Sequence, residues 1–239
     1  MKTPSRPEPW LMACCAWLAC ACVDTYDGNG TPAQETRALS GFDRVLSRGV
    51  LDVAVTRADV FGLTVRIDSN LIERVVTSID ARTLVVQIEG GNLGEHLPGP
   101  HVLVSMPKLS DEELIGSGRL SAVGFSEDAP VSVELVGSGE LTWSGDASDL
   151  AALLQGSGKM VLTGSTSSAA LQLGGSGELD ARALSAESAR IELDGPGSIS
   201  ATVDGRVDAR ATGGGTVELY GDVMEGTWEE SDGATVTAE

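Results

Sequence analysis

The side chains best suited to covalent chemistry in this chain are its thiols. All four cysteines lie within the first 22 of the 239 residues: Cys14, Cys15, Cys20 and Cys22. They belong to an uncharged apolar run, residues 10–23, which follows the basic residues Lys2 and Arg6. Such a run is too short to span a bilayer as a permanent helix, so residues 1–22 are predicted to be a signal peptide. The remaining chain has no cysteine and must fold without disulfides.

Two of these thiols are candidates for acylation. A small residue, Ala19 or Ala21, stands directly before each of Cys20 and Cys22. This arrangement resembles a bacterial lipobox, in which the thiol is acylated and becomes the new N-terminal residue. We therefore predict a lipid anchor to the membrane at Cys20 or Cys22, with removal by the ordinary signal peptidase as the alternative. Neither cysteine is followed by Asp, which by resemblance to lipoprotein sorting signals favours the outer membrane. Residues 23–40 are expected to form a flexible tether.

The two histidines are the candidate metal ligands. His96 and His101 flank a Pro-Gly-Pro loop next to Glu95, but zinc sites usually combine more ligands at tighter spacing. A solvated loop is the preferred interpretation. Residues 174–180 have the glycines of a calcium-binding nonapeptide, but the Asp comes one place late and the repeat is not nine residues long. The sequence therefore predicts no metal and no cofactor.

The charge balance bears on possible partners. The 35 Asp and Glu residues outnumber the 16 Lys and Arg residues, which gives a formal net charge of -19 at pH 7. Such a surface repels phosphate, so no nucleic-acid partner is expected, and it repels anionic lipid headgroups for the same reason. With 41% hydrophobic residues the chain is too apolar for an acidic disordered protein. The charge must therefore coat a folded body.

A Gly-x-Gly tripeptide recurs at intervals of 18 to 21 residues in the second half of the chain. It is GSG at 116–118, 137–139, 156–158 and 175–177, GPG at 195–197 and GGG at 213–215. Apolar and polar residues alternate on both sides of it, and this period of two is typical of strand, turn and strand. One such unit makes one coil of a β-solenoid. The predicted fold is all-β, with a solenoid of about six coils over residues 110–221.

The offset from the first glycine sorts the residues of each coil into columns. Two apolar columns are predicted to face the lumen: Leu114, Leu135, Leu154, Leu173, Leu193 and Ala211 before the glycine, and Leu120, Leu141, Met160, Leu179, Ile199 and Val217 after it. A column of alternating sign is predicted to face outward, in register: Arg119, Glu140, Lys159 and Glu178. The middle residues would stack as a hydroxyl ladder: Ser117, Ser138, Ser157 and Ser176. Turn chemistry is the preferred interpretation of this ladder, and a ligand-facing row is the alternative.

The segments on either side of the solenoid are organised differently. Residues 41–109 contain several candidate strands and a short helical segment that begins after Ser69 or Asn70. They are predicted to form a β-rich cap, because an open solenoid end exposes unpaired strand edges. Residues 222–239 contain two candidate strands around Ser-Asp-Gly, which predict a closing hairpin that carries Trp228.

Three features carry a family resemblance. The body opens with GFDRV at 41–45, continues with DSNL at 68–71 and TLVV at 83–86, and then repeats an LxGSGxL pattern. In this combination residues 41–221 resemble the bacterial family called "putative auto-transporter adhesin, head GIN domain". The resemblance implies an exported or lipid-anchored β-helical protein without established catalytic residues. The chain departs from the pattern where GPG and GGG replace the fifth and sixth GSG.

No catalytic residue is predicted. The body has no GxSxG segment, and no histidine recurs beside its repeated serines. Enzymatic β-helices usually attack acidic polysaccharides with a carboxylate cluster and a basic residue, yet beyond residue 22 the lysines are only Lys108 and Lys159. The leading hypothesis is a non-catalytic, exported envelope lipoprotein, an adhesin-like scaffold that contacts an envelope protein or glycan. The alternatives are an envelope polysaccharide lyase or hydrolase acting in a groove of the solenoid, and a periplasmic sensing or assembly partner.

Overall fold

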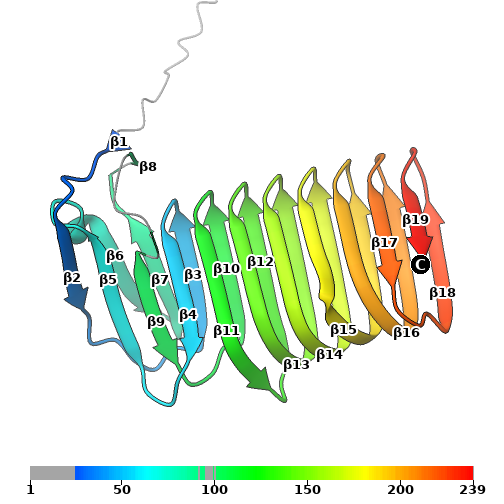
Figure 1. Ribbon diagram of the computed structural model, residues 1–239, viewed down its shortest axis with the longest axis horizontal. Helices are drawn as coiled ribbons and strands as arrows, with labels where there is room; N and C mark the ends of the chain where they lie inside the picture. Colours follow the sequence, from blue (N-terminus) through cyan, green and yellow to red (C-terminus); the bar gives the residue numbers. More distant parts are fainter. Residues whose placement is uncertain (1–24, 91, 95–98, 100, 239) are drawn as a thin grey trace, which may run out of the picture.

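The strands wind into a flattened solenoid, with two faces of parallel β-sheet around one lumen (Figure 1). The computed structural model describes residues 25–90, 92–94, 99 and 101–238. The N-terminal part consists of β1 (Thr25–Tyr26), β2 (Pro32–Thr36), β3 (Arg44–Gly49), β4 (Asp52–Arg57), β5 (Gly62–Asp68), the 3-10 helix η1 (Ile72–Arg74), β6 (Val75–Asp80), β7 (Thr83–Ile88), β8 (Asn92–Leu93) and β9 (Val102–Met106). The chain continues with β10 (Asp111–Gly116), β11 (Arg119–Glu127), β12 (Val131–Gly137), β13 (Glu140–Gly156), β14 (Lys159–Gly175), β15 (Glu178–Asp194), β16 (Ser198–Thr212), β17 (Thr216–Tyr220), β18 (Glu225–Glu230) and β19 (Thr235–Ala238). The prediction of an all-β solenoid is confirmed.

Successive turns stack in parallel, with residues of the same offset over one another. Glu140 pairs with Lys159, and Lys159 with Glu178. The solenoid has about seven turns rather than the expected six. One additional turn consists of β3 and β4, whose corner at Gly49 lies next to the corner at Gly116. This corner has the sequence Gly-Val-Leu and is far from the next one along the chain, so the glycine repeat does not reveal it.

The glycine corners are fixed by contacts between backbones. At Gly156 φ is +126°, and a Cβ atom there would overlap the carbonyl oxygen of Gly137 in the preceding turn. At Gly158 a Cβ atom would lie 2.6 Å from the carbonyl oxygen of Gly139. The middle residue of the tripeptide is exposed, so its side chain can vary. Pro196 has no amide hydrogen to donate to the preceding turn, but the amide of Gly197 donates to the carbonyl of Gly175 at 3.0 Å. In the six tripeptide corners the first and third positions therefore demand glycine, and the second does not. At the Gly49 corner Leu51 takes the third position.

The lumen is filled by the apolar columns that the sequence predicts. Leu154, Leu173 and Leu193 stack in adjacent turns, and none of them exposes more than 2% of its surface. Trp143 is fully buried in the lumen, where it stacks between Ala122 and Leu162 of the adjacent turns. The assignment of inward and outward positions from the glycine offset is therefore confirmed.

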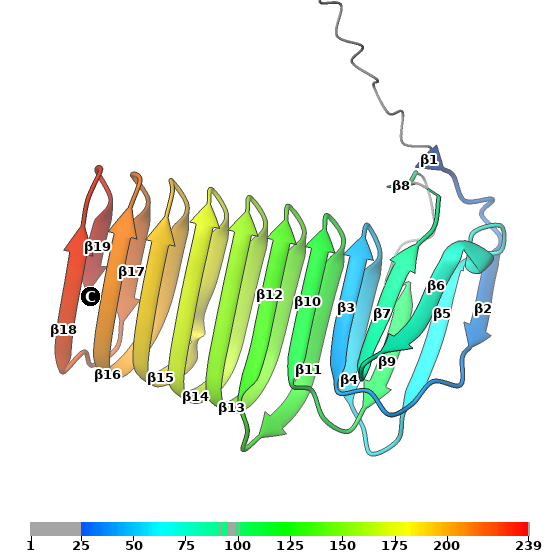
Figure 2. The same cartoon turned by 180° about the vertical axis from the view of Figure 1, so that it is seen from behind.

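The N-terminal cap first extends the two faces of the solenoid and then closes them. β7 pairs in parallel with β3, and β9 with β4. Beyond them the pairing becomes antiparallel, with β6 on β7, β5 on β9 and β2 on β5, at the end of the rod away from β18 and β19 (Figure 2). Residues 32–36, expected in a flexible tether, instead form β2, because they complete the edge of β5. The expected helical segment is the single turn η1. The part of the chain that the structure describes contains no helix with the length and hydrophobicity of a membrane span.

The C-terminal segment forms a last turn where a hairpin was expected. β18 pairs in parallel with β16, and β19 pairs in parallel with β17. The connection between them acts as another corner, with φ of +54° at Asp232 and +82° at Gly233. Trp228 pairs with the buried Ala209 of the preceding turn, so its ring covers an inward position at the end of the rod and stays 43% exposed. The ring occupies the place that a Cβ atom on Gly226 would need. The glycine therefore makes room for a ring that closes the end of the lumen.

Candidate functional site

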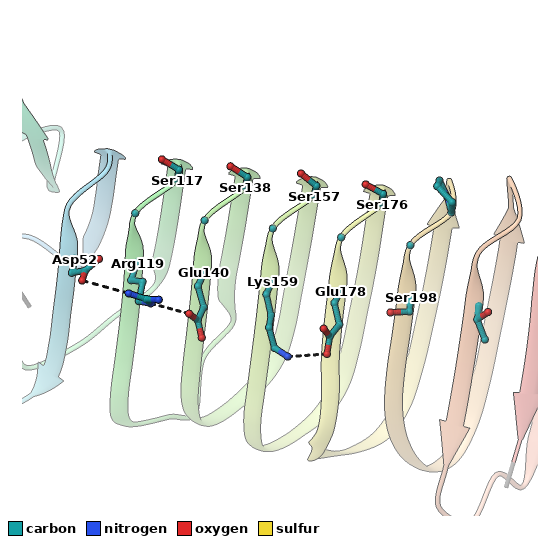
Figure 3. A pocket seen from close by; sticks show the side chains of 17 residues that line it. Asp52, Ser117, Arg119, Ser138, Glu140, Ser157, Lys159, Ser176, Glu178 and Ser198 are labelled. Atoms are coloured by element: carbon teal, nitrogen blue, oxygen red, sulfur yellow. Dashed lines mark hydrogen bonds and ion pairs between the residues drawn. The ribbon is translucent and has the colours of Figure 1, made fainter. Parts of the chain in front are cut away.

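An open groove of about 660 Å³ runs along the solenoid beside the glycine corners, from Asp52 on β4 to Thr216 on β17. Two rows of polar side chains line it (Figure 3). The corner row contains Ser117, Ser138, Ser157 and Ser176, and the charged row contains Asp52, Arg119, Glu140, Lys159 and Glu178, continued by Ser198. We call this surface the corner groove.

Ion pairs between neighbouring turns hold the charged row. Arg119 Nε donates a hydrogen bond to Glu140 Oε2 at 2.9 Å, and Arg119 Nη1 lies 3.7 Å from Asp52 Oδ2. Lys159 Nζ donates to Glu178 Oε1 at 2.9 Å. The side chains of Arg119, Glu140, Lys159 and Glu178 thus face outward in one row, with adjacent turns in register, as the sequence predicts.

These contacts keep both cations of the row charged. The hydrogen bond to Glu140 raises the pKa of Arg119, and the hydrogen bond to Glu178 raises the pKa of Lys159. Both pairs are exposed to solvent, so each contributes only about 0.2–1 kcal/mol to stability. The row is therefore a fixed series of paired opposite charges rather than a stripe of one sign.

The corner serines form the second row. Their backbone is held by the preceding turn: the amide of Ser138 donates to the carbonyl of Gly116, and that of Ser157 to the carbonyl of Gly137, each at 3.0 Å. All four side chains are exposed and point in the same direction away from the corners (Figure 3). Such a row offers a hydroxyl donor and acceptor at each turn, at intervals of about 4.8 Å. A ligand-facing role for this ladder stays a prediction.

The histidine loop differs from the sequence expectation. The candidate acylation sites Cys20 and Cys22, and Glu95 and His96 of the histidine loop, lie outside the described part of the chain. His101, expected in a solvated loop, is only 2% exposed, and its Nδ1 accepts a hydrogen bond from the amide of Asp52 at 2.9 Å. It is buried because it directly precedes β9, which pairs with β4. In the part of the chain that the structure describes, no three His, Cys, Asp or Glu side chains gather to hold a metal ion.

One residue of the corner groove was not recognised in the sequence. Asp52 extends the charged row by one turn towards the cap. It stands three residues after Gly49, the same offset that separates Arg119 from Gly116. That offset is the signal that identifies it once the corner at Gly49 is known.

A second unrecognised residue lies inside the lumen. Glu112 is fully buried on β10 between Val45 of β3 and Val133 of β12. Among the described residues, neither of its carboxylate oxygens meets a hydrogen-bond partner. Burial raises the pKa of Glu112 well above its usual range, so it favours the protonated form. Its signal in the sequence is a single acidic residue in a column that is otherwise Val133, Ala152, Leu171, Ile191 and Ala209.

Solved structures share this architecture. A Bacteroides fragilis protein described as a putative adhesin has a TM-score of 0.79 and 16% identity, over 90% of this chain and 100% of that chain. A Parabacteroides distasonis protein described as a putative lipid binding protein has a TM-score of 0.73 and 20% identity, over 90% and 100% of the two chains. A putative adhesin of Parabacteroides merdae gives 0.67 and 19%, over 91% and 100%. At these identities the likeness shows the fold.

The family is shown by the sequence of the body. A search of curated proteins gave no match. The model of the family "putative auto-transporter adhesin, head GIN domain" matches residues 41–222, which include all strands from β3 to β17 and the repeated glycine corners. The chain therefore belongs to this head GIN domain family.

Proposed function

We propose that this protein is a non-catalytic, adhesin-like lipoprotein of the cell envelope, and that its corner groove contacts an envelope protein or glycan. The observation that carries the proposal is the pair of polar rows, which presents the same groups at a fixed interval over successive turns. Repeated weak contacts add up along an extended partner, because each further contact forms at a high effective concentration. The family description and the names of two similar structures support an adhesin-like role.

The same groove argues against the alternative of a polysaccharide lyase or hydrolase. A lysine that acts as a general base needs a lowered pKa, so that it is neutral near the working pH. Glu178 raises the pKa of Lys159 and holds it as a cation. The carboxylate of Glu140 is likewise engaged by Arg119. These contacts favour a binding surface over a catalytic one.

The family and the N-terminal sequence support a proposed location in the cell envelope. An adhesin family implies an exported protein of the cell surface. The finer proposal is acylation at Cys20 or Cys22 and anchoring in the outer membrane, supported by the small residues before these thiols. Labelling of cells with radioactive palmitate tests it. We expect label on the wild-type protein and none after Cys20→Ser and Cys22→Ser are combined.

The function is tested with the purified protein that begins at Asp24. Immobilised protein is incubated with envelope extract, and the retained material is identified; in parallel, envelope polysaccharides are incubated with soluble protein and examined for cleavage. We expect retention of an envelope glycan or surface protein and no cleavage. Release of shorter sugar chains would establish the lyase or hydrolase alternative. Capture of one periplasmic protein in fixed stoichiometry would instead establish the sensing or assembly partner.

A further inference from the structure

The chain enters the solenoid at one end and is fixed there from its first described residues. β1 and the C-terminal turn lie at opposite ends of the rod (Figure 1). β1 pairs with β8, and the Arg74 guanidinium lies 3.7 Å from the centre of the Tyr26 ring. The amide of Asn29 donates to Asn70 Oδ1 at 3.1 Å, and its side chain donates to Ser69 Oγ at 2.9 Å. β2 then adds to the edge of β5. The segment from Thr25 is therefore part of the cap.

This attachment limits how far the cap can lie from an anchor. Cys22 is three positions before Thr25, and Cys20 is five positions before it. A fully extended chain spans at most about 3.6 Å per residue, so these connections reach roughly 11 and 18 Å. A rod with eight spacings between β9 and β19 is roughly 40 Å long. The cap is thus confined to the neighbourhood of the anchor, whereas the far end is not.

Charge is distributed unevenly between the two ends. Residues 25–109 contain ten Asp and Glu and eight Lys and Arg, a net charge of -2. Residues 110–239 contain 23 Asp and Glu and six Lys and Arg, a net charge of -17. An anionic surface therefore repels the solenoid much more strongly than the cap. The repulsion turns the far end of an anchored rod away from that surface.

We propose that the N-terminal cap is the face that meets an anionic bilayer, and that the acidic solenoid stands away from it with the corner groove exposed along its length. This orientation rests on the lipid anchor of the proposed function. The short connection keeps the cap at the surface, and charge repulsion keeps the solenoid from lying down. The groove is then accessible to a partner outside the membrane, and the turn of β18 and β19 is the most distant part.

Energy transfer to a bilayer tests the orientation. Residues 1–24 are replaced by a hexahistidine tag, which is bound to vesicles of phosphatidylcholine and phosphatidylglycerol with a nickel-chelating lipid and an acceptor dye. The body has no cysteine, so a donor dye can be attached to Ser78→Cys on β6 or to Ser231→Cys in the last corner, both exposed positions. The dyes are chosen with a Förster distance well below the length of the rod.

We expect at least fivefold more efficient transfer from position 78 than from position 231. Equal transfer from both positions means that the rod lies flat, and stronger transfer from 231 means that it is inverted; either result overturns the proposal. Vesicles without phosphatidylglycerol are the second arm. Transfer from 231 should be higher there than on the anionic vesicles, because the repulsion that holds the solenoid off the surface is removed; unchanged or lower transfer refutes the charge argument. The tag replaces acylation, so a failure here leaves the anchor untouched, whereas missing palmitate label rejects the anchor itself.

Discussion

The solenoid and the cap enclose the same lumen by different means. In the solenoid, successive parallel turns repeat the same strand pairing. The offset of a residue from its glycine corner therefore decides whether a side chain such as that of Leu173 or Lys159 faces inward or outward. In the cap, antiparallel strands add to the stack one by one, and each position depends on its own neighbours. At the junction, β3 and β10 bring the carboxyl group of Glu112 into the lumen. The repeated pairing of turns therefore determines the direction of each side chain in the solenoid, whereas individual contacts determine it in the cap and at the junction.

The largest effect is expected from a charge placed in an inward column of the solenoid. Leu173→Asp puts a carboxylate between Leu154 and Leu193, where no partner is available. The free energy of unfolding should fall by about 3 kcal/mol or more, measured by urea denaturation. Gln155→Asp is the control, because Gln155 is exposed on an outward position and pairs with the uncharged residues Val136 and Gly174 of the adjacent turns. Equal stability of the two variants would contradict the alternation of inward and outward columns.

A corner glycine should tolerate less change than the serine beside it. Gly156→Ala adds a Cβ atom that overlaps the carbonyl of Gly137, at a φ of +126°. We expect a loss of about 1–3 kcal/mol, since strain of this kind is not relieved by a side-chain rotation. Ser157→Ala should change stability by less than about 0.5 kcal/mol. Thermal unfolding of both variants makes the comparison, and a stable Gly156→Ala protein would refute the account of the corners.

The junction should make stability depend on pH. Burial raises the pKa of Glu112 in the folded protein, so the stability linked to this group is fully present below the unfolded-state pKa of about 4.3 and is lost as the pH rises towards the folded-state pKa. Glu112→Met fits the apolar column and removes the carboxyl. Its melting temperature should exceed that of the wild type, and the gap should widen from pH 4 to pH 8. At pH 4 the gain is expected to be about 1–3 kcal/mol, from the loss of a buried group without hydrogen-bond partners, and it should grow as the pH rises.

Glu113→Gln is the control for the junction. Burial also raises the pKa of Glu113, but to a lesser degree, because this side chain lies on the outward face. Most of the fall in stability with pH should therefore persist in this variant. If Glu112→Met shows the same fall as the wild type, the lumen does not hold Glu112 as a protonated group.

The smallest effect is expected from the charged row. A double-mutant cycle on Lys159→Met and Glu178→Gln should give a coupling energy of about 0.2–1 kcal/mol, at the low end because both side chains are exposed. The coupling should shrink further in 1 M NaCl, where charges are screened over about 3 Å. A coupling energy well above this range, or one independent of salt, would mean that the pair is more shielded than its exposure indicates.

The repeat explains how much of the fold could be predicted from the sequence. The inward place of Leu173 follows from that of Leu154, because stacked turns share one offset. The cap has no such repeat, and the burial of His101 depends on a strand pairing with a segment 49 residues away. The last turn resembles a hairpin locally, since Ser-Asp-Gly suits both connections. Only the parallel pairing of β18 with β16 and of β19 with β17 distinguishes them.

In the candidate site too, the residues that belong to the repeat could be predicted from the sequence, and the others could not. The alternation of charge from Arg119 to Glu178 predicts the row and its outward direction. Asp52 adds one more charge to the row from the turn of β3 and β4, whose corner at Gly49 has no glycine tripeptide to mark it. Glu112 could not be placed by charge alone, because an acidic residue is expected at the surface and only its column places it inside.

The central claim is that the corner groove carries the contact with the envelope, and a matched pair of variants tests it most directly. Arg119→Gln with Lys159→Gln alters the groove, whereas Arg190→Gln with Arg210→Gln makes the same change of charge on exposed positions outside it. Retention of envelope material on immobilised protein is measured for both and for the wild type. The account predicts at least a fivefold loss for the groove variant and wild-type retention for its control, with equal melting temperatures. Equal retention by all three proteins would contradict it.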